Sequence, residues 1–547
     1  MKKLICILLL LCLCLSLAAC GGGTKGGSTA PTNAPSGNGS TPAPTKAPSG
    51  GDQPSGGNEQ PAEDPMASTL VIGAPADFTG EGKNLVYDRL LFRIDSYSAS
   101  DYVVSSTHND NYTEFTLKVS PGVKFTDGTP VTADIIKYTI ESQLNIAPNG
   151  FAGLIESLEV KDDSTLVMKL TSPYMNTEYD LTYFFVVKPG EISDDGNFVE
   201  WVGTGPYILT DYQADVRAEF TRNEDYWNPA KQGAPKTVIW KVLPDETTRV
   251  MALEKKEVDI LGLGSHAASQ LSNATLKDLE TKGDLKIMVR NGTSPATYMY
   301  NYVEGPMTDI ELRKAVTYAI DRQNMVDALT LGYGRAMGTF LGPEDKYSNR
   351  NGEEYTYDPE LAKKILADAG YKDTNGNGIV EKNGDGKDIV LQFVTMSSDT
   401  YRNIGVLFGE YLKAVGIGME VNSLERNAFL ERTNSGDMDI CMCHPWTTAI
   451  AYFNMRGSTS EYDNFGPGFG VNDKFPEYLQ TVLTSTSEEE IQATFDKIWA
   501  DIYAAYVATP LYASVGTYVH TDEVSGFIWT RGTDNIIDLS EVVINRK

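Results

Sequence analysis

The chain has 547 residues, with 46 lysines and arginines against 74 aspartates and glutamates, and a formal net charge of -28 at pH 7. Such a polyanion is a poor partner for nucleic acid, because neutralising phosphates requires clustered basic side chains. Beyond the first 19 residues no run of about 18 apolar residues occurs, so the sequence predicts no membrane-spanning helix.

The N-terminus has the pattern of a secretory signal peptide. Two lysines precede an apolar stretch from Leu4 to Leu17, which is too short to be retained as a spanning helix. The stretch ends in Leu17-Ala18-Ala19-Cys20, which resembles the bacterial lipobox, where the cysteine is acylated and becomes the mature N-terminus. We therefore expect a lipoprotein signal peptide over residues 1–19 and a lipid on Cys20. The alternative is an ordinary cleavage site that happens to lie beside a cysteine.

Residues 20–66 are predicted to be a disordered linker that follows the lipidated cysteine. Glycine, proline, serine and threonine make up 29 of the 46 residues from Gly21 to Met66. Such a segment buries too little apolar surface to offset its ordering entropy, and it would span about 35 to 40 Å on average. The remaining 481 residues, Ala67 to Lys547, are enough for two to four domains of about 100 to 200 residues each.

Strand and helix patterns alternate along this body. Tyr112 to Val119 alternates apolar and polar side chains, which is typical of a half-buried strand, and Thr132 can cap a helix that continues through Ile140. Four later segments combine helical spacing with start or stop signals. We expect these helices to begin at the capping box of Thr308 and Glu311, at Asp358-Pro359, near Ile404 and at the box of Ser487 and Glu490, and the last three to end before Gly370, Gly416 and Pro510. The alternation favours α/β lobes, which bind ligands in the crevices between them.

The sequence contains none of the common catalytic motifs. The four histidines have no zincin-type spacing, and in Gly262-Leu263-Gly264-Ser265-His266 the serine comes one place too late for a nucleophile elbow. No glycine-rich run continues into a phosphate-binding loop. We therefore expect no enzyme.

Two segments have some features of a metal site. The run from Asp373 to Gly378 imitates the opening of an EF-hand loop, but the twelfth position is Gly384, so calcium would be under-coordinated and a hairpin tip is the simpler interpretation. Cys441-Met442-Cys443-His444 is a soft-metal cluster, yet on a strand the histidine points away from the two cysteines. Buried small cysteines are the simpler interpretation, and two are too few for a disulfide framework. We expect no resident metal and no cofactor.

Four segments together resemble one known family, the extracellular solute-binding proteins of peptide and nickel ABC transporters, family 5. These are Phe115 to Asp134 (FTLKVSPGVKFTDGTPVTAD), Gly203 to Tyr207 (GTGPY) with Arg222 to Pro229 (RNEDYWNP), Asp309 to Arg322 (DIELRKAVTYAIDR) and Asp358 to Tyr371 (DPELAKKILADAGY). They occur in the order of the family and extend the resemblance across nearly the whole body.

The resemblance implies an α/β, two-lobed periplasmic-binding-protein-like fold of class II, cluster C type, with an extra small domain inserted in the N-terminal lobe. It implies that the chain crosses to the second lobe near Asn301 and returns near Pro510. The expected domains are lobe I over 67–95, 196–300 and 510–547, the inserted domain over 96–195, and lobe II over 301–509.

The resemblance also implies where a ligand binds. In peptide-binding members a tryptophan packs on the ligand where a strand of the second lobe ends, and an aspartate three residues later holds the peptide amino terminus. Trp446 matches the tryptophan, but the later position is Ala449. The segment from His444 to Arg456 is somewhat closer to the nickel and metallophore branch, where aromatics and arginine hold a chelated metal. The candidate ligand-binding residues are Phe78, Tyr300, Asn301, His444, Trp446, Thr447, Tyr452 and Arg456. For Trp446, a role as a core indole remains the alternative.

The expected protein is therefore a monomeric substrate-binding lipoprotein of an ABC importer. It would be anchored through its N-terminal lipid on the extracellular or periplasmic face of the cell membrane, and it would partner ABC permease subunits. The expected solute is a dipeptide or oligopeptide; a nickel chelate, metallophore or opine is the alternative within the family. A tethered surface hydrolase and an adhesion protein are the alternatives from other classes.

Overall fold

The structure is a computed structural model, which describes residues 68–94, 98–146, 151–193, 195–262, 271–291, 296–342, 346–349, 354–443, 474–529 and 537–546. The predicted signal peptide, Cys20 and the predicted linker lie outside these residues. None of the helices in the described ranges is long and apolar enough to cross a bilayer.

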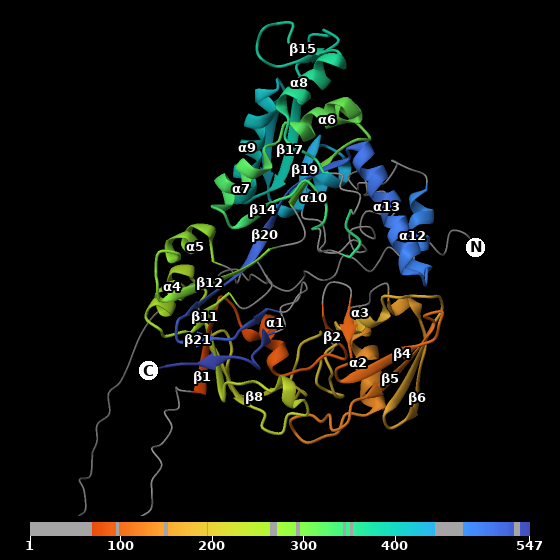
Figure 1. The fold of residues 1–547 in the computed structure, drawn as a ribbon, viewed down its shortest axis with the longest axis vertical. Helices are drawn as coiled ribbons and strands as arrows, with labels where there is room; N and C mark the ends of the chain where they lie inside the picture. Colours follow the sequence, from red (N-terminus) through yellow and green to blue (C-terminus); the bar gives the residue numbers. More distant parts are fainter. Residues whose placement is uncertain are drawn as a thin grey trace, which may run out of the picture.

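One large mixed sheet runs through both lobes of the molecule (Figure 1). In order, its strands are β18 (Gly418–Leu424), β17 (Val390–Met396), β19 (Ile440–Cys443), β13 (Ala296–Tyr300), β20 (Ala508–Thr521), β11 (Ile260–Leu261), β1 (Thr69–Ala74), β10 (Thr237–Val242), β9 (Arg217–Arg222) and β8 (Tyr207–Gln213), with β12 (Leu285–Asn291) and β14 (Gly334–Ala336) also paired to β20. The first part of β20 pairs with β13 and β14 and its last part with β11 and β12. This strand therefore connects lobe II to lobe I.

Lobe I is built on the parallel pair β1 and β10, whose inward side chains form a buried core. Leu70, Ile72, Val238 and Trp240 belong to this core, and the Trp240 indole donates to the Ala76 carbonyl at 2.9 Å. Its helices are α1 (Phe78–Glu81), η2 (Gly82–Leu85), η4 (Pro229–Lys231), α4 (Glu246–Glu254) and α5 (Asn273–Leu279), and two short ribbons pair β21 (Val524–Ser525) with β24 (Val543–Ile544) and β22 (Ile528–Trp529) with β23 (Ile537–Asp538).

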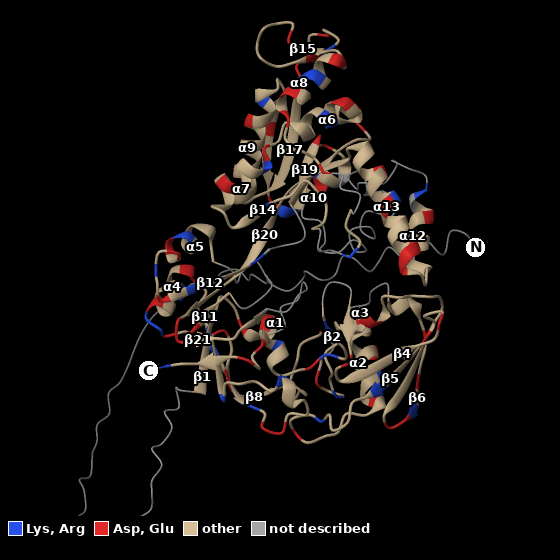
Figure 2. Ribbon diagram, viewed as in Figure 1, with Lys and Arg blue, Asp and Glu red and all other residues tan. Residues whose placement is uncertain are grey.

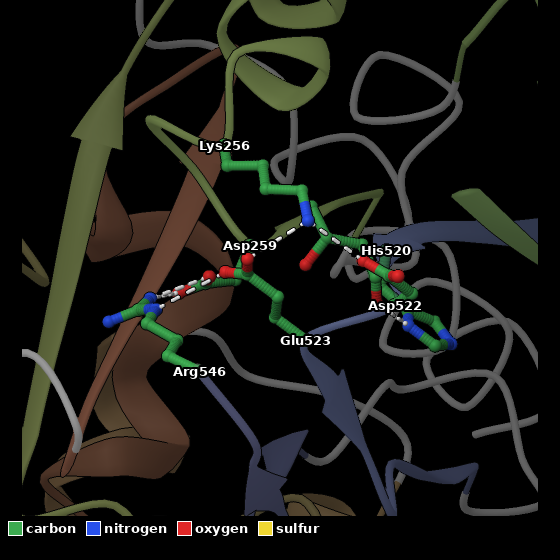
Figure 3. Close-up of polar contacts among 7 residues, drawn as sticks. Lys256, Asp259, His520, Asp522, Glu523 and Arg546 are labelled. Atoms are coloured by element: carbon green, nitrogen blue, oxygen red, sulfur yellow. Dashed lines mark hydrogen bonds and ion pairs between the residues drawn. The ribbon is translucent and has the colours of Figure 1, made fainter. Parts of the chain in front are cut away.

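A polar network ties the C-terminal segment to this sheet (Figure 3). The buried Asp259 carboxylate accepts the Val71 backbone N–H at 2.6 Å and lies 2.5 and 2.6 Å from the Arg546 guanidinium. The Lys256 ammonium pairs with Asp522 at 3.0 Å and with Glu523 at 2.9 Å. Because Asp259 is 1% exposed, its charge depends on Arg546 for compensation.

Replacing Arg546 by alanine should lower the free energy of unfolding by about 3 kcal/mol, because it leaves a buried carboxylate without its cation. Urea denaturation of the two proteins measures the difference. Arg426→Ala is the control, since Arg426 is an exposed arginine at the start of helix α10 (Arg426–Ser435), and we expect a change within about 0.5 kcal/mol. Equal stability of Arg546→Ala and Arg426→Ala would contradict the stabilising role of the Asp259–Arg546 ion pair.

The small inserted domain is a separate antiparallel sheet packed on one helix. Its strand order is β4 (Val104–His108), β5 (Glu114–Val119), β7 (Thr165–Leu170) and β6 (Ile155–Asp162), and the helix is α2 (Ala133–Ile146). Phe115 and Leu117 from β5 meet Ile136 and Ile140 from α2 in its core. The predicted half-buried strand and the predicted helix after Thr132 are therefore confirmed. The domain also contains β2 (Phe92–Arg93), β3 (Ala99–Ser100), η3 (Ala152–Leu154) and α3 (Thr177–Leu181).

A buried carboxylate joins the inserted domain to lobe I and contacts the motif from Arg222 to Pro229. Asp88 is 3% exposed and accepts hydrogen bonds from the hydroxyls of Tyr102 and Tyr226 and from the Trp227 indole, at 2.8 to 2.9 Å. Burial raises the pKa of Asp88 to about 6, against the opposing effect of these donors. The Tyr226-Trp227 pair is therefore part of the scaffold.

The Gly203-Thr204-Gly205 motif packs directly on the backbone of residues 86–88. Gly205 donates its N–H to the Val86 carbonyl at 2.8 Å, and the Asp88 N–H is donated to the Thr204 hydroxyl at 3.3 Å. A β-carbon on Gly203 would lie 2.0 Å from the Val86 carbonyl oxygen. Glycine is required there because the two backbones touch.

Helices surround the lobe II half of the sheet: η5 (Pro306–Thr308), α6 (Ile310–Tyr318), α7 (Arg322–Thr330), α8 (Pro359–Asp368), α9 (Asp399–Ala414), α10, α12 (Phe475–Thr484) and α13 (Glu488–Ala505). The predicted starts at Asp358 and Ser487 are confirmed, since Asp358 accepts the Leu361 N–H and Ser487 the Glu490 N–H. The predicted helices that end at Gly370 and Gly416 are likewise confirmed, and both glycines have positive φ.

The predicted start of one helix and the predicted end of another were wrong. The N-cap of α6 is Asp309, whose carboxylate accepts the Glu311 N–H at 2.9 Å, because Thr308 still belongs to a preceding 3-10 turn. The helix α13 ends at Ala505 with Tyr506 in a left-handed conformation, before the predicted stop at Pro510. Pro510 lies inside β20 instead.

Candidate functional site

The candidate site is the one that the sequence predicts at the end of β19, between the two lobes. Strand β19 pairs with β13 and β17 and ends at Cys443, directly before the segment that the sequence predicts to hold the ligand. His444, Trp446, Thr447, Tyr452 and Arg456 all lie outside the described residues. The structure therefore describes the framework that leads into the predicted site, and the ligand-binding role of these five residues stays a prediction.

The inserted domain also reaches lobe II. Met175, which precedes α3, packs against a lobe II cluster that contains Phe340, Tyr347, Phe495 and Trp499. Figure 1 shows α3 and β2 on the side of the lower half that faces lobe II. A solute between the lobes would thus have the inserted domain close by, a feature that sequence reasoning missed because Met175 lies in no recognisable motif.

Phe78 lies in the core of lobe I. It is 0% exposed and its ring contacts those of Trp201, Tyr212 and Phe220, with centroid distances of 4.5, 5.3 and 5.1 Å. The preceding residue, Asp77, caps α1 by accepting the Thr79 N–H at 3.1 Å. In this structure Phe78 fills the core, and its contact with a ligand stays a prediction.

Tyr300 is also fully buried, at the end of β13. Its hydroxyl lies 2.6 Å from the Thr509 hydroxyl and 3.4 Å from that of Thr317. Burial raises the pKa of Tyr300 above its ordinary value. The tyrosine thereby links β13, β20 and α6.

Asn301 has all of its amide hydrogen-bonding capacity used within lobe II. Its nitrogen donates to the carbonyls of Gly436 and Met438 at 3.0 and 3.1 Å, and its oxygen accepts the N–H groups of Val303 and Glu304 at 3.2 Å each. Tyr300 belongs to a lobe II core cluster and Phe78 to the lobe I core. The structure therefore does not bring Phe78 together with Tyr300, and ligand contacts by Tyr300 and Asn301 stay predictions.

Cys441 is a buried cysteine on β19, and its side chain packs in the same lobe II cluster as Met299 and Val394. Among the residues that the structure describes, no three histidine, cysteine, aspartate or glutamate side chains are placed to hold a metal ion. The side chain of Cys443 and all of His444 lie outside the described set.

One acid near the interlobe contact was not singled out from the sequence. Asp180 lies on α3, five residues after Met175, and burial raises the pKa of its carboxyl to about 7. The Tyr174 hydroxyl and the positive charge of Arg93 act in the opposite direction. An incoming ammonium group would favour the ionised form of such a carboxyl.

The comparisons with known proteins agree with this architecture. The model of the family "Bacterial extracellular solute-binding proteins, family 5 Middle" matches residues 99–462. The chain is 23% identical over 449 residues to the nickel-binding periplasmic protein of Escherichia coli (strain K12), covering 78% of this chain and 84% of that relative. It is 27% identical over 347 residues to the oligopeptide-binding protein AppA of Bacillus subtilis (strain 168), covering 59% of this chain and 61% of that relative.

Solved structures show the same fold. NikA from Brucella suis in complex with Fe(III)-EDTA matches with a TM-score of 0.77 and 22% identity, covering 87% of this chain and 99% of that chain. AppA from Bacillus subtilis in complex with a nonapeptide matches with a TM-score of 0.64 and 20% identity, covering 87% of this chain and 99% of that chain. The fold is thus the mixed α/β, two-lobed fold of periplasmic binding proteins.

The chain belongs to the bacterial extracellular solute-binding proteins of family 5. Proteins of this family bind peptides or other small molecules outside the cytoplasm and work with ABC permeases, and they are transport proteins at the family level. The resemblance found in the four sequence motifs is thereby confirmed.

Proposed function

We propose that the protein is the lipid-anchored receptor of an ABC importer that captures a peptide between its two lobes. The observation that carries this proposal is the match to the family over residues 99–462, joined to a sheet in which β20 passes from one lobe to the other. Hinge bending about such connections would close the lobes on the solute and present the complex to the permease. The proposed lobe and domain boundaries follow those expected from the sequence, except that β2 groups with the inserted domain, and β13 and the first part of β20 group with lobe II.

The anchor is part of this proposal. Acylation of Cys20 and the linker over residues 20–66 would hold the body outside the membrane while leaving it about 35 to 40 Å of reach. A tethered hydrolase on the same anchor is the alternative from another class, and it would release products from peptides.

A chelated metal is the second candidate ligand, and Ala449 favours it. Without a carboxylate at that position, a bound peptide ammonium would need another acid, because a buried unpaired charge is costly. A chelate, whose charge is largely neutralised internally, needs only aromatic walls from Trp446 and Tyr452 and a cation such as Arg456. Peptides remain the proposal, and Asp180 on α3, five residues after Met175, is the acid that we propose for the ammonium group.

Calorimetry with a tripeptide and with its N-acetylated form tests the peptide proposal. If an acid binds the ammonium, acetylation should weaken binding at least tenfold, and Asp180→Asn should weaken binding of the free tripeptide while leaving the acetylated form unchanged. Asp134→Asn, an exposed aspartate in the first turn of α2, is the matched control. Equal affinity for both peptides would mean that the amino terminus is not recognised, and the chelate would then become the favoured ligand class.

A further inference from the structure

A half-buried lysine in lobe I has neighbours that do not compensate its charge. Lys83 lies in η2, directly after α1, and Figure 1 shows α1 on the side of lobe I that faces lobe II. The ammonium nitrogen of Lys83 lies 4.8 Å from the centre of the Phe198 ring. Among the residues that the structure describes, no acid forms an ion pair with this ammonium group.

The charge that acts on Lys83 is another cation. The guanidinium group of Arg89 lies close enough to repel the ammonium group, and burial together with this repulsion lowers the pKa of Lys83. A cation that is partly withdrawn from water destabilises the fold unless an anion compensates it. An anion bound beside Lys83 would remove this cost, and the described part of the chain supplies none there.

The two cations lie on neighbouring aromatic rings. The guanidinium carbon of Arg89 lies 4.5 Å from the centre of the Phe185 ring, and the rings of Phe185 and Phe198 have their centres 6.1 Å apart. Each ring attracts its cation through the ring quadrupole but carries no net charge. The aromatic contacts therefore position Lys83 and leave its three N–H donors for a ligand.

These cations lie close to the element that carries the proposed acid of the solute site. Arg89 donates to the Thr182 carbonyl at 2.8 Å, and Thr182 is the C-cap residue of α3, two residues after Asp180. Figure 2 shows basic residues in this part of the molecule, near α1 and β2. A solute with a positive and a negative end would thus meet charges of both signs along one junction between lobe I and the inserted domain.

We propose that Lys83, with Arg89 beside it, binds the C-terminal carboxylate of the peptide. This site rests on the proposed peptide-receptor function and specifies the ligand as a peptide with a free carboxylate. The Lys83 ammonium group donates charge-assisted hydrogen bonds to the carboxylate. Arg89 contributes a second positive charge, while its own N–H groups hold the Asn84 side-chain oxygen at 3.3 Å and the Thr182 carbonyl.

Calorimetry of the full-length chain with a tripeptide and with its C-terminal amide tests this site. The parent protein should bind the amide at least tenfold more weakly, because charge-assisted hydrogen bonds are lost. Lys83→Met should weaken binding of the free tripeptide at least tenfold and bind the amide as the parent does, so that the two peptides become equal ligands. Lys118→Met is the matched control, since Lys118 is an exposed lysine of β5, and this variant should retain the preference of the parent.

Thermal unfolding without ligand separates a binding role from a structural one. Lys83→Met removes an uncompensated charge and keeps an apolar side chain against Phe198, so the variant should unfold at or above the temperature of the parent. The proposal is overturned if the parent binds the tripeptide and its amide equally, if Lys83→Met still prefers the free tripeptide, or if Lys83→Met unfolds at a lower temperature. Each of these outcomes leaves peptide binding by the parent intact, whereas failure of both peptides to bind the parent would contradict the proposed function together with this site.

Discussion

Replacing Trp446 by alanine should weaken solute binding more than tenfold while the protein stays folded. If the indole forms a wall of the proposed site, it contributes contact area to the ligand without closing a core, and aromatic residues in such positions carry a large share of binding energy. Calorimetry with the tripeptide or chelate that binds the parent protein measures the loss, and thermal unfolding of the ligand-free variant reports on the fold.

Trp499→Ala is the contrasting variant. Trp499 is 1% exposed, donates its indole N–H to the Tyr347 carbonyl at 2.7 Å and stacks between Phe340 and Phe495. Its removal should lower the free energy of unfolding by about 3 to 5 kcal/mol. If Trp446→Ala loses stability to the same extent, Trp446 is a core residue and the predicted ligand wall is wrong.

Replacing Gly203 by alanine should destabilise lobe I by about 3 kcal/mol or more. The added β-carbon would lie 2.0 Å from the Val86 carbonyl oxygen and 2.7 Å from the Tyr87 ring, so two backbone segments would have to separate. Overpacking against a backbone is poorly accommodated because no side chain can rotate out of the way. Urea denaturation of the variant measures the loss.

Gly153→Ala is the matched control for this substitution. Its β-carbon would meet nothing within 4 Å, so we expect a change within about 0.5 kcal/mol. Equal stability of the two variants would show that the Gly203 segment can move away from residues 86–88, and the scaffold role of the motif would have to be abandoned.

Local patterns predicted several elements correctly because the same residues determine both the element and its packing. The alternation of Phe115 and Leu117 and the spacing of Ile136 and Ile140 place these residues in one core. The cap at Asp358 was equally predictable, since it depends on contacts within one turn. The helix ends were less predictable, because the end of α13 depends on where β20 begins to pair.

Some long-range polar contacts could not be predicted from the sequence, for a physical reason. The charge on Asp259 is compensated by Arg546, 287 residues later, and the Asp388 carboxylate meets Asn375 and Asn377 only once the hairpin has formed. Contacts of this kind come from the tertiary fold and leave no local pattern. Phe78 was a candidate ligand-binding residue, and the structure surrounds it with three aromatic rings; its contact with a ligand stays a prediction.

Native mass spectrometry of the full-length chain, before and after incubation with a pool of short peptides and a pool of chelated metals, tests the central claim most directly. We expect one solute per chain, which denaturation releases with its mass unchanged, because a receptor binds and presents its ligand without breaking bonds. Recovery of cleaved peptides would contradict the account and indicate a hydrolase, and the absence of any bound solute from both pools would contradict the receptor function itself.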